Sequence, residues 1–320
     1  MSPRVVAFGV HIADALGWPF TVIPPGQELE FIQQIKFTAA GTAAATSVVL
    51  AKLGIDVAAV GKVGEDSMGD FLRSTMAGYG VNIDHVTTTD RAQTSGSLLP
   101  IRPDGSRPAL HVVGANAVLS EADIPWELVE CAEVFHMGGA FILPAIDGAP
   151  MARILRRVKE LGLTVTMDFL MSRRDDAQEL ITPSLQYVDY LMPNIEEAGW
   201  LVGTDDRTEI IRWLHDRGVG TTSLTLGGDG VSIAPNGQSE RVLPAFAVDV
   251  IDTTGCGDAY SAGLISGLVD GLDVYQAATR GLACGSLVAS GLGADSGVVD
   301  LAQVEDFIAH HPRHPALAMT

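Results

Sequence analysis

The chain has little cysteine, few basic residues and no long apolar run. Its three cysteines, Cys131, Cys256 and Cys284, are an odd number at wide spacing, which favours free thiols in a reducing compartment over disulfides. The 20 Lys and Arg against 39 Asp and Glu give a formal net charge of -19, which argues against a nucleic-acid-binding protein. No apolar run reaches the ~18 residues of a membrane helix, and no signal-peptide pattern opens the chain, so we expect a soluble, cytoplasmic protein that does not bind membranes.

Several catalytic motifs are also absent from the sequence. It has no GxxxxGK[ST], HExxH, GxSxG or CxxC pattern, which excludes the common forms of P-loop kinase, zinc hydrolase, serine hydrolase and dithiol redox enzyme. A GxGxxG fingerprint is missing too, which weighs against a dinucleotide-binding oxidoreductase.

What the chain does contain is a repeated alternation of strand-like and helix-like segments. The predicted strands are residues 4–10, 57–60, 134–137, 164–167, 190–192 and 223–226. The predicted helices are residues 43–53, 69–79, 150–161, 195–202, 207–217 and one that begins near 258. This alternation predicts an α/β fold with a doubly wound, mostly parallel sheet, helices on both faces, and ligands at the carboxyl ends of the strands.

Two segments interrupt the alternation. Residues 15–37 contain several prolines before an extended run, and residues 91–113 contain a hairpin pattern around the turn at 103–105. Their β segments can pair into a small sheet outside the core. The core then comprises residues 1–14, 38–90 and 114–320. Because a small sheet with apolar side chains is marginal alone, we expect two copies of the chain to form a homodimer through it.

The most informative stretch is VIDTTGCGDAYSAGL at residues 250–264. Gly255, Cys256 and Gly257 precede a small-residue helix. A glycine-rich turn at a helix start leaves backbone N–H groups free to bind phosphate or charge developing in a transition state. Asp258 beside this loop is either a helix cap or the general base that takes the proton from an attacking hydroxyl.

The segment DTTGCGDAYSAGL resembles the C-terminal signature of the ribokinase-like (phosphofructokinase-B type) carbohydrate kinases, with Cys256 where alanine is usual. AGTAAATSVVLAKLG at residues 40–54 is similar to the family's N-terminal di-glycine motif, and the resemblance runs through nearly the whole chain. It implies an ATP-dependent kinase that phosphorylates a primary hydroxyl of a sugar, with Asp258 as general base and residues 255–257 as the anion hole. In that family the small sheet is a lid over the active site.

The resemblance also implies which residues bind the sugar. Asp14 would accept hydrogen bonds from two sugar hydroxyls, although a loop or cap aspartate is the alternative. Gly41 and Thr42 of the di-glycine motif and Asn116 near the lid would lie beside it, and Asn116 could equally serve to turn the chain. Ala45 stands where an asparagine usually contacts the sugar, so one of the usual hydrogen bonds is missing.

The nucleotide and metal residues follow from further matches. NIEE at 194–197 matches the family's NxxE motif. The match implies that Asn194 binds on the nucleotide side of the site and that Glu197 holds Mg²⁺ through water. The alternative is that the two residues form a helix-capping pair. The carbonyl of Asp252 would help to hold a monovalent cation such as K⁺. The other implied nucleotide contacts are Thr225, Gly227, Gly230, Gly255, Gly257 and Cys284.

The sequence leaves the acceptor open. A nucleoside kinase of the same family would need an aromatic surface for the base, which Trp18, Phe20 and Phe37 could supply. A non-catalytic sugar-binding sensor on the same fold is a further alternative, against which the intact Asp258 and its neighbouring glycines argue.

Several polar residues outside these motifs have structural interpretations. Arg107 matches a position where some family members bind substrate, but an arginine in a hairpin is usually solvated. Asp168 at a strand end can form the wall of the site or act as a hinge. His310, His311 and His314 belong to a proline-containing tail, which we expect to be solvent-exposed rather than metal-binding.

Overall fold

Strand β1 (Val5–Gly9) lies near the middle of a large sheet in the computed structural model, which describes residues 2–172 and 174–314. Within these residues nine strands form the sheet, in the order β13-β12-β11-β10-β9-β8-β1-β4-β5, and all neighbours are parallel except the pairs that include β12. The other strands are β4 (Val57–Gly64), β5 (Asn82–Thr89), β8 (Val134–Ala140), β9 (Thr164–Phe169), β10 (Tyr190–Leu191), β11 (Thr221–Thr225), β12 (Val231–Pro235) and β13 (Arg241–Leu243). The predicted doubly wound, mostly parallel sheet is confirmed.

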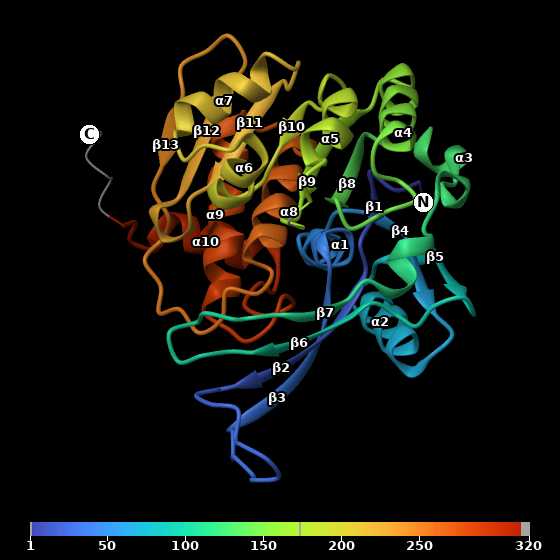
Figure 1. Ribbon diagram of the computed structural model, residues 1–320. Helices are drawn as coiled ribbons and strands as arrows, with labels where there is room; N and C mark the ends of the chain where they lie inside the picture. The colour runs from blue at the N-terminus through green and yellow to red at the C-terminus, as the bar shows by residue number, and fades with distance from the viewer. Residues whose placement is uncertain (1, 173, 315–320) are drawn as a thin grey trace.

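Helices cover both faces of this sheet (Figure 1). Side chains alternate along β1, so that Val5 and Ala7 pack into one core and Val6 and Phe8 into the other. The first core is covered by α1 (Thr42–Lys52), α2 (Ser67–Gly78), α8 (Cys256–Val269), α9 (Val274–Ala289) and α10 (Leu301–His310). The second is covered by α3 (Trp126–Val129), α4 (Ala149–Glu160), α5 (Ala177–Leu185), α6 (Ile195–Val202) and α7 (Arg207–His215). In the described part of the chain, no helix has the length and apolar character needed to cross a bilayer.

A second, smaller sheet lies beyond the edge of the core, at the bottom of Figure 1. It consists of β3 (Gln34–Ala40), β2 (Ile12–Trp18), β6 (Gly96–Pro100) and β7 (Leu110–Val112), in that order. The pairing of β6 with β7 confirms the hairpin at 91–113. The pairing of β2 with β3 runs from Trp18↔Gln34 to Ile12↔Ala40. The small sheet therefore includes residues 12–14 and 38–40, which the sequence analysis assigns to the core. We keep the name lid for these four strands.

The connections place a topological switch point beside β1. After β1 the chain forms β2 and β3 of the lid, returns to β4 on one side of β1, and later crosses to β8 on the other side. Ligands of open α/β sheets bind where the strand order reverses in this way, at the carboxyl ends of the strands. Helix α1 and the lid both start from this point, which makes it the expected location of the site.

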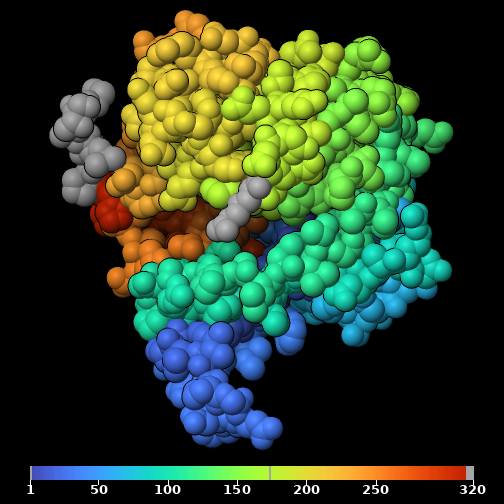
Figure 2. All heavy atoms as spheres, in the orientation of Figure 1, coloured from blue at the N-terminus to red at the C-terminus, as the bar shows by residue number. Residues whose placement is uncertain are grey.

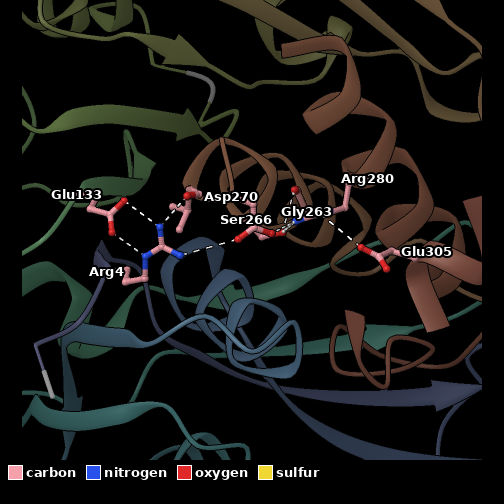
Figure 3. A network of polar contacts seen from close by, with 8 residues as sticks. Arg4, Glu133, Gly263, Ser266, Asp270, Arg280 and Glu305 are labelled. Atoms are coloured by element: carbon pink, nitrogen blue, oxygen red, sulfur yellow. Dashed lines mark hydrogen bonds and ion pairs between the residues drawn. The ribbon is translucent and has the colours of Figure 1, made fainter. Parts of the chain in front are cut away.

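A polar network holds the opposite end of the sheet (Figure 3). Arg4, just before β1, donates from Nε to Glu133 Oε1 at 2.6 Å and from Nη2 to Val269 O at 2.6 Å. Arg280 of α9 donates to Asp270 Oδ2 at 2.6 Å. Because Arg280 is buried, this pair spares the core an unpaired guanidinium charge. The network anchors the C-terminal end of α8, whose N-terminal end forms part of the site.

Candidate active site

A cleft with a volume of about 610 Å³ opens between the lid and the carboxyl ends of the strands. Figure 2 shows it as a hollow between the blue-green lid hairpin and the yellow and orange parts of the chain. Most residues predicted from motifs lie in its wall: Asp14, Gly41, Thr42, Asn194, Glu197, Thr225, Gly227, Gly230, Gly255, Cys256, Gly257 and Asp258. Residues far apart in the sequence are thus brought to one place.

The N-terminus of α8 forms the centre of this wall. Gly255 is the N-cap residue in the left-handed conformation, with φ of 78°, and a Cβ there would lie 2.4 Å from Ala294 Cβ, so the position requires glycine. Among the described residues no side chain caps the helix, and Asp258 lies inside its first turn. The capping interpretation of Asp258 is therefore wrong. The first-turn N–H groups and the positive end of the helix dipole face the cleft. One of these groups, Cys256 N, also donates a long hydrogen bond of 3.4 Å to Thr253 O.

Asp258 has the electrostatics of a base that works near neutral pH. Burial raises the pKa of its carboxyl to about 6; the positive charge of Arg107 opposes this rise, and the negative charge of Asp14 adds to it. The side chain is still partly exposed through the cleft. A reachable carboxylate with such a pKa is suited to take a proton from a hydroxyl. The neighbouring Cys256 thiol is no competing nucleophile, because burial raises its pKa to about 12.

Asp14 offers a free acceptor on the lid side of the cleft. It lies on β2 with only 6% of its surface exposed, and among the described residues its Oδ1 atom has no hydrogen-bond partner. Burial raises the pKa of this carboxyl to about 6. A buried, unpartnered carboxylate oxygen in the wall of a cleft is unfavourable unless a ligand donates a hydrogen bond to it.

Asp168 at the end of β9 is also part of the wall, as expected for a strand-end carboxylate. Its Oδ1 atom accepts a hydrogen bond from Gly139 N at 2.7 Å, which holds the loop after β8. Burial and then the nearby charge of Asp258 raise the pKa of Asp168 well above its usual value. Asp168 therefore positions the neighbouring backbone, and its raised pKa favours the neutral form of its carboxyl.

Asn194 and Glu197 do form the capping pair that was the alternative interpretation. Asn194 N donates to Glu197 Oε2 at 3.0 Å, and Glu197 N donates to Asn194 Oδ1 at 2.7 Å. Both side chains nevertheless line the cleft, and burial raises the pKa of Glu197 to about 7. The described residues contain no cluster of three His, Cys, Asp or Glu that could hold a metal ion. The carboxylate of Glu197 is an oxygen donor of the kind that Mg²⁺ prefers, so this part of the wall fits the ion.

Two predicted contacts are not brought into the cleft. Asn116 is completely buried, and its side chain bonds to the backbone of His11 at both ends: His11 N donates to Oδ1 at 3.1 Å, and Nδ2 donates to His11 O at 3.0 Å. Cys284 is completely buried in the apolar core on α9. Both residues are thus placed as structural residues, and neither belongs to the cleft wall.

Asp252 lies behind the α8 N-terminus and joins two loops. Its Oδ1 accepts from Thr254 N at 2.9 Å, and its Oδ2 accepts from Gly293 N at 2.8 Å in the loop after α9. Three carbonyls of that loop, those of Leu292, Asp295 and Val298, already accept hydrogen bonds from Lys36 or Lys52. The monovalent-cation site at Asp252 stays a prediction.

Two parts of the wall go beyond the sequence prediction. Arg107 is exposed, as expected for an arginine in a hairpin, but it also lines the wall from the β6–β7 connection, and its charge lowers the pKa of Asp14 and Asp258 against the effect of burial. The apolar end of the cleft is lined by Leu282 and Ala289, near the predicted contact Cys284, and by four residues that the sequence did not indicate: Ala245, Phe246, Val248 and His314. No local motif marks these four residues, because they meet only through the tertiary fold.

Comparison with known proteins agrees with this geometry. The family description "pfkB family carbohydrate kinase" matches residues 18–300, so the chain belongs to this family and is a carbohydrate kinase. A ribokinase of Haemophilus influenzae is 26% identical over 291 residues, covering 89% of this chain and 92% of that protein. A probable chloroplastic fructokinase-6 of Arabidopsis thaliana is 28% identical over 309 residues, covering 92% of this chain and 79% of that protein.

The fold is also that of solved ribokinases. The structure of Arabidopsis thaliana ribokinase complexed with ribose and ATP has a TM-score of 0.81 at 24% identity, covering 96% of this chain and 99% of that one. A ribokinase structure from Thermotoga maritima also has a TM-score of 0.81, at 22% identity and 96% coverage of this chain. The expected ribokinase-like fold is confirmed.

Proposed function

We propose that the protein transfers the γ-phosphoryl group of ATP to a primary hydroxyl of a sugar or sugar-like molecule. The observation that supports this most is the position of Asp258. Its carboxyl, with a pKa of about 6, lies in the first turn of an uncapped helix and in the same cleft as the unpartnered oxygen of Asp14. Phosphoryl transfer requires a group that binds the substrate hydroxyls, a base that takes the proton, and a site that stabilises the phosphate charge.

The reaction runs between the lid side of the cleft and α8. Asp14 accepts hydrogen bonds from sugar hydroxyls beside Gly41 and Thr42. Asp258 takes the proton of the attacking primary hydroxyl, whose oxygen forms a bond to the γ-phosphorus while the bond to the β–γ bridging oxygen breaks and ADP leaves. The N–H groups of residues 255–257 stabilise the charge on the transferring group.

The nucleotide would bring its negative charge into an acidic cleft, where a bound Mg²⁺ would supply the compensating positive charge. Glu197 and Asn194 would hold the ion through water, and the ion would neutralise phosphate charge. The residues of the β11–β12 connection, Thr225, Gly227 and Gly230, would lie along the phosphates and ribose.

The lid excludes water from this reaction, and its outer face supports a dimer. Five apolar side chains on the lid strands are strongly exposed: Ile35 (68%), Phe37 (58%), Leu98 (60%), Leu110 (67%) and Val112 (49%). An open, apolar sheet face of this kind is a marginal structure in water. We propose that a second copy of the chain covers it with the same face, as two-fold symmetry requires.

The arrangement of aromatic residues favours a sugar over a nucleoside as acceptor. Trp18 packs in the lid cluster with Leu16 and Leu99, and Phe37 packs edge-on against Phe71 with 6.1 Å between ring centroids. Within the described residues, Trp18, Phe20 and Phe37 are all outside the cleft wall. The three aromatic side chains that could stack on a base near the lid are therefore placed elsewhere.

A test is ADP release in the presence of Mg·ATP and one acceptor at a time: ribose, fructose, 2-keto-3-deoxygluconate, adenosine, inosine or cytidine. We expect turnover with a sugar and background release with Asp258→Asn under the same conditions. Turnover with nucleosides alone would support the nucleoside kinase. Tight sugar binding without ADP release from any acceptor would overturn the proposal in favour of a sensor.

A further inference from the structure

The C-terminal segment is not a free tail but is paired along the apolar end of the cleft. Ala247 N donates to Pro312 O at 2.9 Å. His314 N donates to Ala245 O, also at 2.9 Å. These two bonds frame an antiparallel bridge and place residues 312–314 beside the segment that precedes α8. In Figure 2 the red end of the chain accordingly borders the orange side of the hollow.

Side chains of the same segment fix one residue of the cleft wall from behind. The Phe246 ring contacts both the ring of Phe307, with 5.1 Å between centroids, and the guanidinium of Arg313, 4.4 Å from the Phe246 centroid. Arg313 Nη1 also donates to Pro244 O at 3.0 Å. Because Phe246 is only 1% exposed, its ring can hardly turn without displacing Phe307 or Arg313.

The wall that these contacts support differs from the rest of the cleft. The lid end carries Asp14 and Arg107, and the centre carries Asp258. The end beside Phe246 is formed by Ala245, Val248, Leu282, Ser286 and Ala289, with the polar side chain of His314 at its edge. A flat apolar wall with a few polar groups at its rim suits the base and ribose of a nucleotide whose phosphates reach α8.

We propose that Arg313 and His314, next to the end of α10, belong to the nucleoside-binding wall of this enzyme. Arg313 is a positioning residue that holds Phe246, and His314 contacts the nucleoside part of the bound nucleotide. This inference rests on the proposed function, since it assumes that a nucleotide occupies the cleft with its phosphates at α8. His310, His311 and His314 are exposed to solvent, as the sequence predicted, and the inference adds a binding role for His314 at the edge of the cleft.

The experiment compares four full-length variants: Arg313→Ala, Arg313→Lys, His314→Ala and the control His310→Ala. His310 lies on the same segment, but its side chain is 75% exposed and its ring nitrogen contacts Asp306 on α10 instead of the wall. Binding of Mg·ADP is measured by titration calorimetry, which needs no sugar. The KM values for ATP and for the sugar are measured separately.

We expect Arg313→Ala to weaken Mg·ADP binding and raise the KM for ATP by about tenfold, because Phe246 is then no longer held in its position in the wall. Arg313→Lys keeps the charge and should recover part of this loss. His314→Ala should also weaken Mg·ADP binding. The KM for the sugar should stay at its wild-type value in all of them, and His310→Ala should match the wild type throughout.

Two results would overturn the inference and leave the kinase intact: wild-type Mg·ADP affinity in Arg313→Ala and His314→Ala, or a loss of stability with equal rises in both KM values. The second result would mean that the segment only supports the fold. If the wild-type protein bound neither Mg·ADP nor Mg·ATP, the proposed function would fail, and this inference would fail with it.

Discussion

Lys36 on lid strand β3 and Asp295 in the loop after α9 form an ion pair, with 2.6 Å between Nζ and Oδ1. Thr38 and Tyr79 donate further hydrogen bonds to the same carboxylate, at 2.9 Å and 3.1 Å. Although burial opposes it, these contacts hold the pKa of Asp295 below its usual value. The loop that carries Asp295 also bonds to Asp252 through Gly293 N, so the lid is linked to the loop at the start of α8.

Replacing the lid cation should loosen this link. Lys36→Met leaves Asp295 without its charged partner, and we expect a lower unfolding temperature and a raised KM for the sugar. Lys36→Arg keeps the charge and serves as the control. Thermal unfolding and steady-state kinetics test this, and a wild-type sugar KM in Lys36→Met would show that the pair does not set the position of the lid.

Asp258→Asn should separate activity from stability. Loss of a positioned general base should reduce kcat by about 10²–10⁴-fold, with ATP binding retained. The unfolding temperature at pH 8 should rise, because burial disfavours the ionised carboxyl and the amide carries no charge. Turnover near the wild-type rate would contradict the role of Asp258 as the base.

The pH dependence follows from the same carboxyl. Asp258 must be ionised to accept a proton, so kcat/KM should fall as the pH drops below about 6 and level off above it. A carboxyl whose pKa is raised in the folded state binds protons more readily there than in the unfolded chain. Its contribution to the free energy of unfolding therefore decreases as the pH rises from the usual value of 3.8 to about 6.

A comparison of wild type with Asp258→Asn isolates this contribution from other titrating groups. The difference between their unfolding temperatures should be largest at pH 8 and should vanish as the pH approaches 4. A difference that stays constant over this range would mean that the variant acts through packing instead of charge.

Asp14→Ala tests sugar recognition. Losing a charged hydrogen-bond acceptor costs about 1.5–3 kcal/mol, so the KM for the sugar should rise by about ten- to a hundredfold. The KM for ATP should change little, because Asp14 lies at the lid end of the cleft. Equal rises in both KM values would instead point to a purely structural role.

The lid dimer is tested with a charge on its apolar outer face. Leu98 is 60% exposed, so Leu98→Glu is tolerated in a monomer but buries two like charges in the proposed dimer. We expect the wild type to sediment as a dimer at micromolar concentration and the variant as a monomer. A wild-type protein that is monodisperse and monomeric at that concentration would rule out the dimer.

The sequence predicted the central sheet because buried strands and glycine-ended helices have local signals. It also predicted that Asp14, Glu197 and Asp258 lie in one site, since residues at the carboxyl ends of parallel strands share an edge of the sheet, and all three line the cleft. Asn116 was misplaced because its polar side chain is satisfied by the backbone of a residue far away in the sequence, His11. The wall beside His314 was missed for a related reason: its contacts join segments that no local pattern connects.

One placement ties recognition of the acceptor to the covering of the site. Asp14 belongs to a strand of the lid, whereas Asp258 lies on a core helix. In the proposed reaction, the free energy gained when sugar hydroxyls bind Asp14 is therefore gained by the element that shields the site. A bound acceptor then stabilises the covered state in which it reacts. Water does not stabilise that state, because it cannot bridge Asp14 and Asp258 in the same way. Protection of ATP from hydrolysis would thus be a thermodynamic result of how the acceptor is recognised.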